Sequence, residues 1–227
     1  MRPQLTERYE DGVPAPVLVW RLDAPVLAIS SAALGGGIGT RHWVLNASVP
    51  MSYDRPDPRA HLAEMAAGLG LRGPGVGLLT GVDVADFVLA DDGGAQVVAT
   101  IGLGAPGWAA APDGDLVRWR PDTVNVVVWV PAALSPAALV NAVATVAEAK
   151  AQALAELGVP GTGTATDATC VLCPVDGAAE PYGGPRSRWG ARVARAAHAA
   201  VLAGGRCWLA GGESWSDRMP EEPVQRT

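Results

Sequence analysis

The sequence predicts an α+β protein, in which a mainly antiparallel sheet built from hairpins carries two long helices to form a layered α/β sandwich. Short apolar runs separated by turn residues fill most of the N-terminal half, a pattern typical of strands. Two long segments of the C-terminal half instead carry apolar residues at helical spacing. Because the hairpins precede the long helices rather than alternate with them, an α+β fold is favoured over a doubly wound sheet.

The N-terminal elements begin with two apolar runs, Val17–Trp20 and Val26–Ser30, which flank the turn sequence RLDAP and predict a hairpin. A glycine-rich loop, SSAALGGGIGTRH, then leads to a third strand at Trp43–Val49. The segment DPRAHLAEMAAGLG predicts a helix, with Asp57 as its N-cap and Pro58 in its first turn. The run GVGLLTGV predicts a short strand after it.

The middle of the chain predicts a second hairpin and a buried strand. ADFVLADDGGAQVVATIGL contains two apolar runs joined by a turn at Asp91–Gly94, and DTVNVVVWV is continuously apolar after its first residues. The longest helix is predicted from Ala137 to Leu157, capped by Ser135 and stopped by Gly158 and the following proline.

The C-terminal part begins with the threonine-rich stretch GTGTATD, followed by a predicted strand at Ala168–Val175. A last helix is predicted from Ser187 to Leu202, ending at Gly204 and Gly205. Residues 1–210 are expected to form a single domain, and residues 211–227 a poorly ordered tail.

The composition excludes several classes of function. The chain has 227 residues, of which 49% are hydrophobic and 18% charged, as in a packed globular protein. A net charge of −6 argues against nucleic acid or an anionic membrane surface as the main partner. The N-terminus lacks the apolar stretch of a signal peptide, and no run is long enough for a membrane helix. We therefore expect a cytoplasmic protein; the sequence leaves homo-oligomer formation open.

The three cysteines are Cys170, Cys173 and Cys207. The Cys170-x-x-Cys173 spacing suggests a metal or redox pair, but no second pair follows and the histidines are distant in sequence. On a strand, the two side chains would point to opposite faces. We predict neither a metal site nor a disulfide.

Lys150 breaks the pattern of the long helix. Leu139, Val143, Val146, Leu154 and Leu157 form one apolar stripe, and Lys150 falls about 20° from Leu139 at ~100° per residue. A lysine in this position must extend to the solvent edge, pair with an acid or stay desolvated. Glu148 lies on the opposite, polar stripe, where a solvated glutamate is usual.

The stretch GTGTATD admits two interpretations, a threonine-rich turn or the edge of a site. In an extended conformation Thr162, Thr164 and Thr166 would share one face, and Asp167 would point to the other. A nucleophilic threonine needs a base, for which Asp167 or Lys150 is available. None of the three histidines has a recognisable catalytic signature around it.

The motifs, taken in order, resemble the adenosylcobinamide amidohydrolase (CbiZ) family from about Val17 to Leu202. The likeness rests on SSAALGGG with LNASV after it, on VGLLTGVDV, ATIGLG and TVNVVVWV, and on LSPAALVNAVATVAEAKAQALAELGV, GTGTATDATCV and YGGPRSRWG. The family's TEAK appears here as AEAK, which keeps Glu148 and Lys150 but not the threonine. The pattern TGTxTDA also matches this chain, ending at Asp167 and Ala168.

The resemblance implies hydrolysis of the amide that joins the aminopropanol arm to the corrin ring of adenosylcobinamide, giving adenosylcobyric acid in cobalamin salvage or cobamide remodelling. It implies a small-molecule corrinoid substrate that carries its own cobalt, and no further cofactor. Amide hydrolysis needs an activated nucleophile, donors for the oxyanion and an acid for the leaving amine. The candidate catalytic residues are Asp167 or Glu148 as base, Lys150 as acid or electrostatic stabiliser, and Thr166.

The candidate substrate-binding residues are small or amide-bearing groups that suit a broad substrate rimmed with amides, or hydroxyls that could hold the oxyanion. They are Ser31, Gly35, Gly36, Gly37, Asn46, Asn125, Thr162 and Thr164. We favour a water activated by a carboxylate, with a threonine nucleophile as the alternative.

The sequence departs from the family where members often carry a Thr-His pair, because this chain has Arg186-Ser187. The role of that histidine therefore does not transfer to this chain. The departure keeps two other functions open, a corrinoid-binding protein without turnover and an amidohydrolase that acts on another amide.

Overall fold

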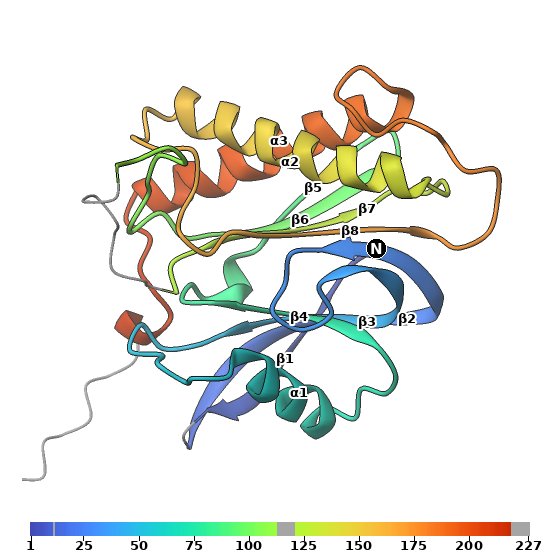
Figure 1. Ribbon diagram of the computed structural model, residues 1–227. Helices are drawn as coiled ribbons and strands as arrows, with labels where there is room; N and C mark the ends of the chain where they lie inside the picture. Colours follow the sequence, from blue (N-terminus) through green and yellow to red (C-terminus); the bar gives the residue numbers. More distant parts are fainter. Residues whose placement is uncertain (11, 113–120, 219–227) are drawn as a thin grey trace, which may run out of the picture.

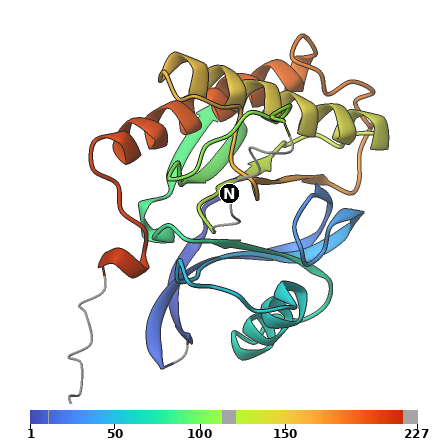
Figure 2. The ribbon, with the colours of Figure 1, turned by 60° about the vertical axis from the view of Figure 1, so that its left-hand side comes forward.

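The computed structural model describes residues 1–10, 12–112 and 121–218, and arranges them in four layers (Figures 1 and 2). Helices α2 (Pro136–Glu156) and α3 (Arg188–Leu209) cover one face of strands β5 to β8. The other face of these strands packs on a second layer of strands, β1 to β4. Helix α1 (Pro58–Gly68) covers the outer face of that second layer. The layered α+β architecture is therefore confirmed.

Strand β2 (Val13–Ser30) joins the two strand layers. It pairs along most of its length with β3 (Gly37–Ser48), with β1 (Gln4–Glu10) on its first half and with β8 (Ala168–Pro174) on its second. The hairpin expected at RLDAP is wrong, since this segment lies within the single strand. The reason is that each half of β2 has its own partner, and the pairing register shifts between Arg21 and Val26, where the strand can bend.

The remaining strands complete a mixed sheet in the order β4-β3-β2-β8-β7-β6-β5, with β1 beside β2. Strands β5 (Val88–Asp92) and β6 (Ala95–Ile101) form the predicted hairpin. The sheet is mainly antiparallel, but β4 (Gly75–Thr80) runs parallel to β3, and β7 (Val124–Trp129) runs parallel to β8. In each parallel pair a helix (α1 or α2) connects the two strands. Such a crossover returns the chain to the same end of the sheet, so the second strand runs in the direction of the first.

The helices begin as the sequence predicts, with side chains of Asp57, Ser135 and Ser187 accepting backbone N–H bonds from their first turns. Helix α3, however, does not end at Gly204 and Gly205. These two glycines are positions of close packing, since a Cβ on them would overlap Ile101 or Leu157, and the helix continues past them. Short 3₁₀ helices lie at Val84–Asp86 and Ser216–Arg218.

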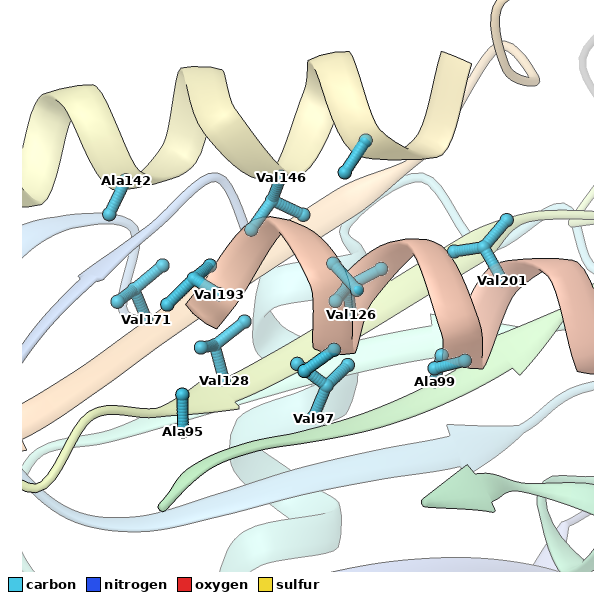
Figure 3. Close-up of a cluster of buried hydrophobic side chains, with 14 of the residues drawn as sticks. Ala95, Val97, Ala99, Val126, Val128, Ala142, Val146, Val171, Val193 and Val201 are labelled. Atoms are coloured by element: carbon cyan, nitrogen blue, oxygen red, sulfur yellow. The ribbon is translucent and has the colours of Figure 1, made fainter. Parts of the chain in front are cut away.

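Two cores of the molecule lie on either side of strands β6, β7 and β8. Figure 3 shows the first, in which valines and alanines of these strands meet small side chains of α2 and α3. The second lies between the strand layers and includes Leu18, Trp20 and Val127. Cys170 belongs to this second core and Cys173 to the first, so the two thiols lie on opposite faces of β8 as expected.

The end of the described chain packs on the domain. Trp215 is buried, and its backbone N–H donates to the carbonyl of Gly81 at 2.8 Å. The predicted tail begins at residue 211, and its residues 219–227 lie outside the described residues. Among the described helices, none is both long and apolar enough to cross a membrane.

A buried amide bridge joins the two strand layers. Asn46 of β3 donates to the hydroxyl of Thr100 on β6 at 3.0 Å, and Asn125 of β7 donates to the Asn46 side-chain oxygen at 2.9 Å. Asn125 also donates to the carbonyl of Leu79 on β4 at 2.8 Å. All three polar side chains are at most 2% exposed. Asn46 therefore fixes how one layer sits on the other.

We expect Asn46→Ala to lower the free energy of unfolding by about 1–3 kcal/mol, because Thr100 and Asn125 would each lose a buried partner. Urea denaturation measures the change. Asn141→Ala, on the exposed face of α2, is the matched control and should have a far smaller effect. A loss equal to that of the control would show that the bridge does not hold the layers together.

Candidate active site

The stretch GTGTATD lies at the edge of the sheet where β7 and β8 begin. Because these strands are parallel and in register from Asn125 and Ala168, the residues before them meet at one end of the sheet. Asp167, directly before β8, accepts the backbone N–H of Val124 at 2.9 Å. Thr166 lies beside Thr123, with their hydroxyl oxygens 3.1 Å apart.

Asp167 is the centre of a hydrogen-bonded cluster. Its Oδ2 contacts the Lys150 ammonium and accepts the backbone N–H of Thr164 at 3.1 Å. Its Oδ1 accepts the Thr164 hydroxyl at 2.5 Å in addition to the Val124 N–H. The carboxylate thus accepts from four donors, which is as many hydrogen bonds as its two oxygens ordinarily accept. Of the three alternatives for Lys150 on the apolar stripe, the structure has the pair with an acid, and the two side chains are only 15% and 13% exposed.

Glycines make this cluster sterically feasible. A Cβ at Gly163 would overlap both the Asp167 carboxylate and the Lys150 ammonium. The backbone of Gly107, in the loop after β6, donates to the carbonyl of Gly163 at 2.8 Å and accepts from Thr162 N–H at 2.8 Å. A Cβ at Gly161 would collide with that same Gly107 backbone. The alternation of glycine and threonine therefore lets two backbones approach closely while leaving the hydroxyls in place.

The segment is not extended, so the arrangement expected for an extended conformation, with Asp167 on the face opposite the threonines, does not apply. A turn at Ala165 and Thr166 reverses the chain, so that the Thr164 hydroxyl reaches Asp167. Asp167 stabilises this turn by accepting both the N–H and the hydroxyl of Thr164, three positions earlier in the chain.

Two cavities lie on either side of this turn. The Lys150 cavity, of about 310 Å³, is lined by Lys150, Thr162, Thr164 and the loop residues Gly107 and Trp108, among others. The Asp167 cavity, of about 360 Å³, is lined by Asp167, Thr166, Ser31, Asn125 and Tyr53, together with apolar residues of β4 and α1. Since Thr164 and Ala165 line one cavity and Thr166 and Asp167 the other, the turn is their common wall.

Most of the residues predicted from the sequence meet at these cavities. Ser31 lies at the mouth of the Asp167 cavity, where its hydroxyl accepts the N–H of Thr169 at 3.1 Å. Asn125 forms part of the wall, although its amide nitrogen is already used in the bridge to Asn46. Thr162 lines the Lys150 cavity and accepts the N–H of Ala109 at 3.1 Å.

Other predicted residues lie apart from the Asp167 cluster. Glu148 is exposed and lines a separate groove with His198 and Arg195, between α2 and α3. Asn46 lies between the strand layers. The glycines 35–37 line neither cavity, and two of them have a structural explanation. Gly35 has a φ of +75° and packs on the backbone of Gly75, while Gly37 has a φ of +80°.

Sequence reasoning missed two residues of the site, Thr123 and Tyr53. Thr123 could have been found, because it immediately precedes a strand that is parallel to β8, as Asp167 does. Tyr53 lies in an irregular loop between β3 and α1 and has no periodic signal. The one indication was its partner His61, a titratable residue on the otherwise apolar buried face of α1.

The arrangement has the parts of an amide-cleaving site. It holds a hydroxyl on one oxygen of a carboxylate, a partly buried ammonium on the other oxygen, and further hydroxyls and amides on two flanking cavities. A hydroxyl–carboxylate–lysine set of this kind can supply a nucleophile, a proton acceptor and electrostatic stabilisation of an oxyanion. Fold and site thus define a layered α+β protein with the groups of a hydrolase.

Comparison with known proteins gives the family. The model of the family described as adenosylcobinamide amidohydrolase matches residues 2–212, so this chain belongs to that family. A protein of Halobacterium salinarum named adenosylcobinamide amidohydrolase is 35% identical over 193 residues, which cover 82% of this chain and 83% of that protein. A Methanosarcina mazei protein of the same name is 29% identical over 183 residues, or 77% of this chain and 88% of its own.

We expect the Lys150–Asp167 pair to contribute to stability as a coupled unit. Lys150→Met and Asp167→Ala should each destabilise the protein, because each leaves an unpaired charge. The double variant removes both charges and should lose about 1–3 kcal/mol less than the sum of the two single losses. Urea unfolding of the four proteins of the cycle measures this coupling.

The exposed pair Arg195–Asp92 provides the matched control cycle, with Arg195→Met and Asp92→Ala. Its coupling should be smaller, because solvent screens exposed charges. Additive effects at Lys150 and Asp167 would contradict a coupled pair.

Proposed function

We propose that the protein hydrolyses the amide between the corrin ring and the aminopropanol arm of adenosylcobinamide, releasing adenosylcobyric acid and aminopropanol. The family supports the substrate class, and the cluster of Thr164, Asp167 and Lys150 supports the chemistry. The corrinoid brings its own cobalt as part of the substrate. The setting we propose is cobamide salvage in the cytoplasm.

The observation that carries the proposal is the Thr164 hydroxyl bound to Asp167 beside a lysine. Of the two routes open from the sequence, this contact supports a threonine nucleophile, and Thr164 rather than Thr166. Asp167 already accepts four hydrogen bonds, so a water would have to displace one of them to be activated. The Thr164 hydroxyl already donates to Asp167, so no hydrogen bond has to be displaced before Asp167 can accept its proton.

In the proposed reaction, Thr164 Oγ1 attacks the amide carbon while its proton passes to Asp167. The new C–O bond gives a tetrahedral intermediate, whose negative oxygen the Lys150 ammonium stabilises. The C–N bond then breaks, and Asp167 returns the proton to the leaving amine. A water hydrolyses the ester on Thr164, which restores the hydroxyl and releases the corrin carboxylate.

The two cavities suit the two parts of the substrate. A corrin ring with its amide side chains is too broad for either cavity, so it would lie over the opening of the Lys150 cavity. There Trp108, 61% exposed, offers an apolar face. The short aminopropanol arm would cross the turn and enter the Asp167 cavity, with its polar wall of Asn125, Thr166 and Ser31.

The departure at Arg186-Ser187 lies away from this centre. Ser187 caps α3 by accepting the N–H of Gly190 at 3.1 Å, and Arg186 is exposed. Neither residue lines the Lys150 or the Asp167 cavity. This placement supports turnover by this chain rather than corrinoid binding alone.

We expect the purified protein to convert adenosylcobinamide to adenosylcobyric acid, as followed by chromatography. Thr164→Ala should lower kcat at least 100-fold by removing the nucleophile, while Thr164→Ser should retain much of the activity. Glu148→Gln, a variant of the exposed carboxylate, is the matched control and should leave kcat unchanged.

Hydroxylamine should intercept the acyl-threonine and yield a corrin hydroxamate.

Turnover by Thr164→Ala without hydroxamate formation would favour the water route. Binding of adenosylcobinamide by the wild type without any product would instead identify a corrinoid-binding protein. Cleavage of other amides but not of adenosylcobinamide, in a substrate panel, would identify a different amidohydrolase.

A further inference from the structure

The oxyanion of the proposed reaction needs hydrogen-bond donors on the side of Thr164. The Thr164 hydroxyl donates to Oδ1 of Asp167, whereas the Lys150 ammonium contacts Oδ2, so the two groups occupy different oxygens of one carboxylate. The negative oxygen develops on the carbon that Thr164 Oγ1 attacks. Since oxyanion sites commonly combine several fixed donors, a second donor close to Thr164 is expected beside Lys150.

The turn after Thr164 has two backbone N–H groups that the turn itself does not use. Ala165 and Thr166 are its central residues. The hydrogen bond of a β-turn joins the first residue to the fourth, here Thr164 and Asp167. Among the residues that the structure describes, neither central N–H has an acceptor, whereas the N–H groups of Thr162 and Thr164 are bonded at 2.8 and 3.1 Å. The turn therefore presents unused backbone donors directly after the hydroxyl that attacks.

The two central residues of the turn line different cavities. Ala165 is exposed and lines the Lys150 cavity together with Thr164 and Lys150. Thr166 instead lines the Asp167 cavity. The side chain of Ala165 is a single methyl group, which leaves its backbone open to a substrate. Ala165 therefore carries the unused N–H that shares a cavity with both the nucleophile and the ammonium.

We propose that the backbone N–H of Ala165 is an oxyanion donor, which holds the negative oxygen of the tetrahedral intermediate together with Lys150. The inference rests on the proposed function, in which Thr164 is the nucleophile. Hydrolases that carry a nucleophilic serine on a tight turn use the N–H of the following residue in this way. The N–H keeps its proton throughout and contributes only a hydrogen bond, which strengthens as negative charge develops on the oxygen.

Removal of this one N–H group tests the proposal. Proline has no N–H and is favoured at the first central position of the common β-turns, so Ala165→Pro should fold as the wild type does. We expect its kcat for adenosylcobinamide to fall about 100-fold and its KM to change less than about threefold, because the donor acts on the charge of the transition state. Chromatography of the product gives both constants. Ala165→Ser, which keeps the N–H, is the matched control and should retain the wild-type kcat.

A second variant is needed because proline also restricts the backbone of Thr164, the residue before it. L-Lactic acid in place of Ala165, inserted by translation in vitro, replaces the N–H with an ester oxygen and keeps the methyl group. This ester variant should lower kcat to the same extent. Thermal unfolding shows which variants are folded, and the ester variant decides if Ala165→Pro is not. An ester variant with the kcat of the wild type would overturn the proposal, even where Ala165→Pro is slow.

The outcomes separate this inference from the proposed function. Wild-type protein that binds adenosylcobinamide without hydrolysing it would overturn both. Turnover that survives in Thr164→Ala would overturn the nucleophile, and with it the role of the N–H that follows. Turnover that requires Thr164 but not the N–H of Ala165 would overturn the inference alone.

Discussion

The contact between Lys150 and Asp167 is the interaction on which the site depends. It joins the middle of the long helix α2 to the turn before β8. Both side chains are largely shielded from solvent, so either charge would be costly to bury without the other. The glycine at position 163 is required because any side chain would occupy the place of this pair. The Thr164 hydroxyl and two backbone N–H groups converge on the same carboxylate. A helix, a turn and the start of two strands are thus held in one geometry by a single acidic side chain.

The long strand β2 makes the second contribution, because it carries the sheet from one layer into the other. Without that crossing, Asp167 and Tyr53 would belong to separate layers with no common cavity. The amide bridge from Asn46 to Thr100 and Asn125 then sets how the layers lie on each other. The cavity walls therefore come from segments distant in the sequence, Ser31, Tyr53 and Asn125 among them. Both layers thus contribute side chains to the wall of the Asp167 cavity.

The sequence correctly predicted those elements that depend on residues close together in the chain. The caps at Asp57 and Ser135, the start of the last helix near Ser187 and the hairpin of β5 and β6 follow from neighbouring residues, and so does Lys150 as an outlier on its stripe. The predicted hairpin at RLDAP was wrong because distant strands determine how β2 pairs. The predicted end of α3 was wrong because Gly204 and Gly205 allow close packing inside the helix. Within the site, the family pattern located Asp167 and Lys150, but Glu148 shares their motif and faces elsewhere. Only the turn in three dimensions brings the hydroxyl of Thr164, rather than that of Thr166, to Asp167. Only the contact between the layers places Tyr53 in the wall of the Asp167 cavity.

A crystal structure of the Thr164→Ala protein with adenosylcobinamide bound would test the proposed mechanism most directly. We expect the scissile amide to lie over the turn at residues 164–167, with its carbon within about 3.5 Å of the position of the missing hydroxyl, as a near-attack geometry requires. The corrin would rest on the side of Trp108 and the arm would enter the Asp167 cavity. An amide bound in the groove of Glu148 and His198, or out of reach of the turn, would rule out Thr164 as the nucleophile.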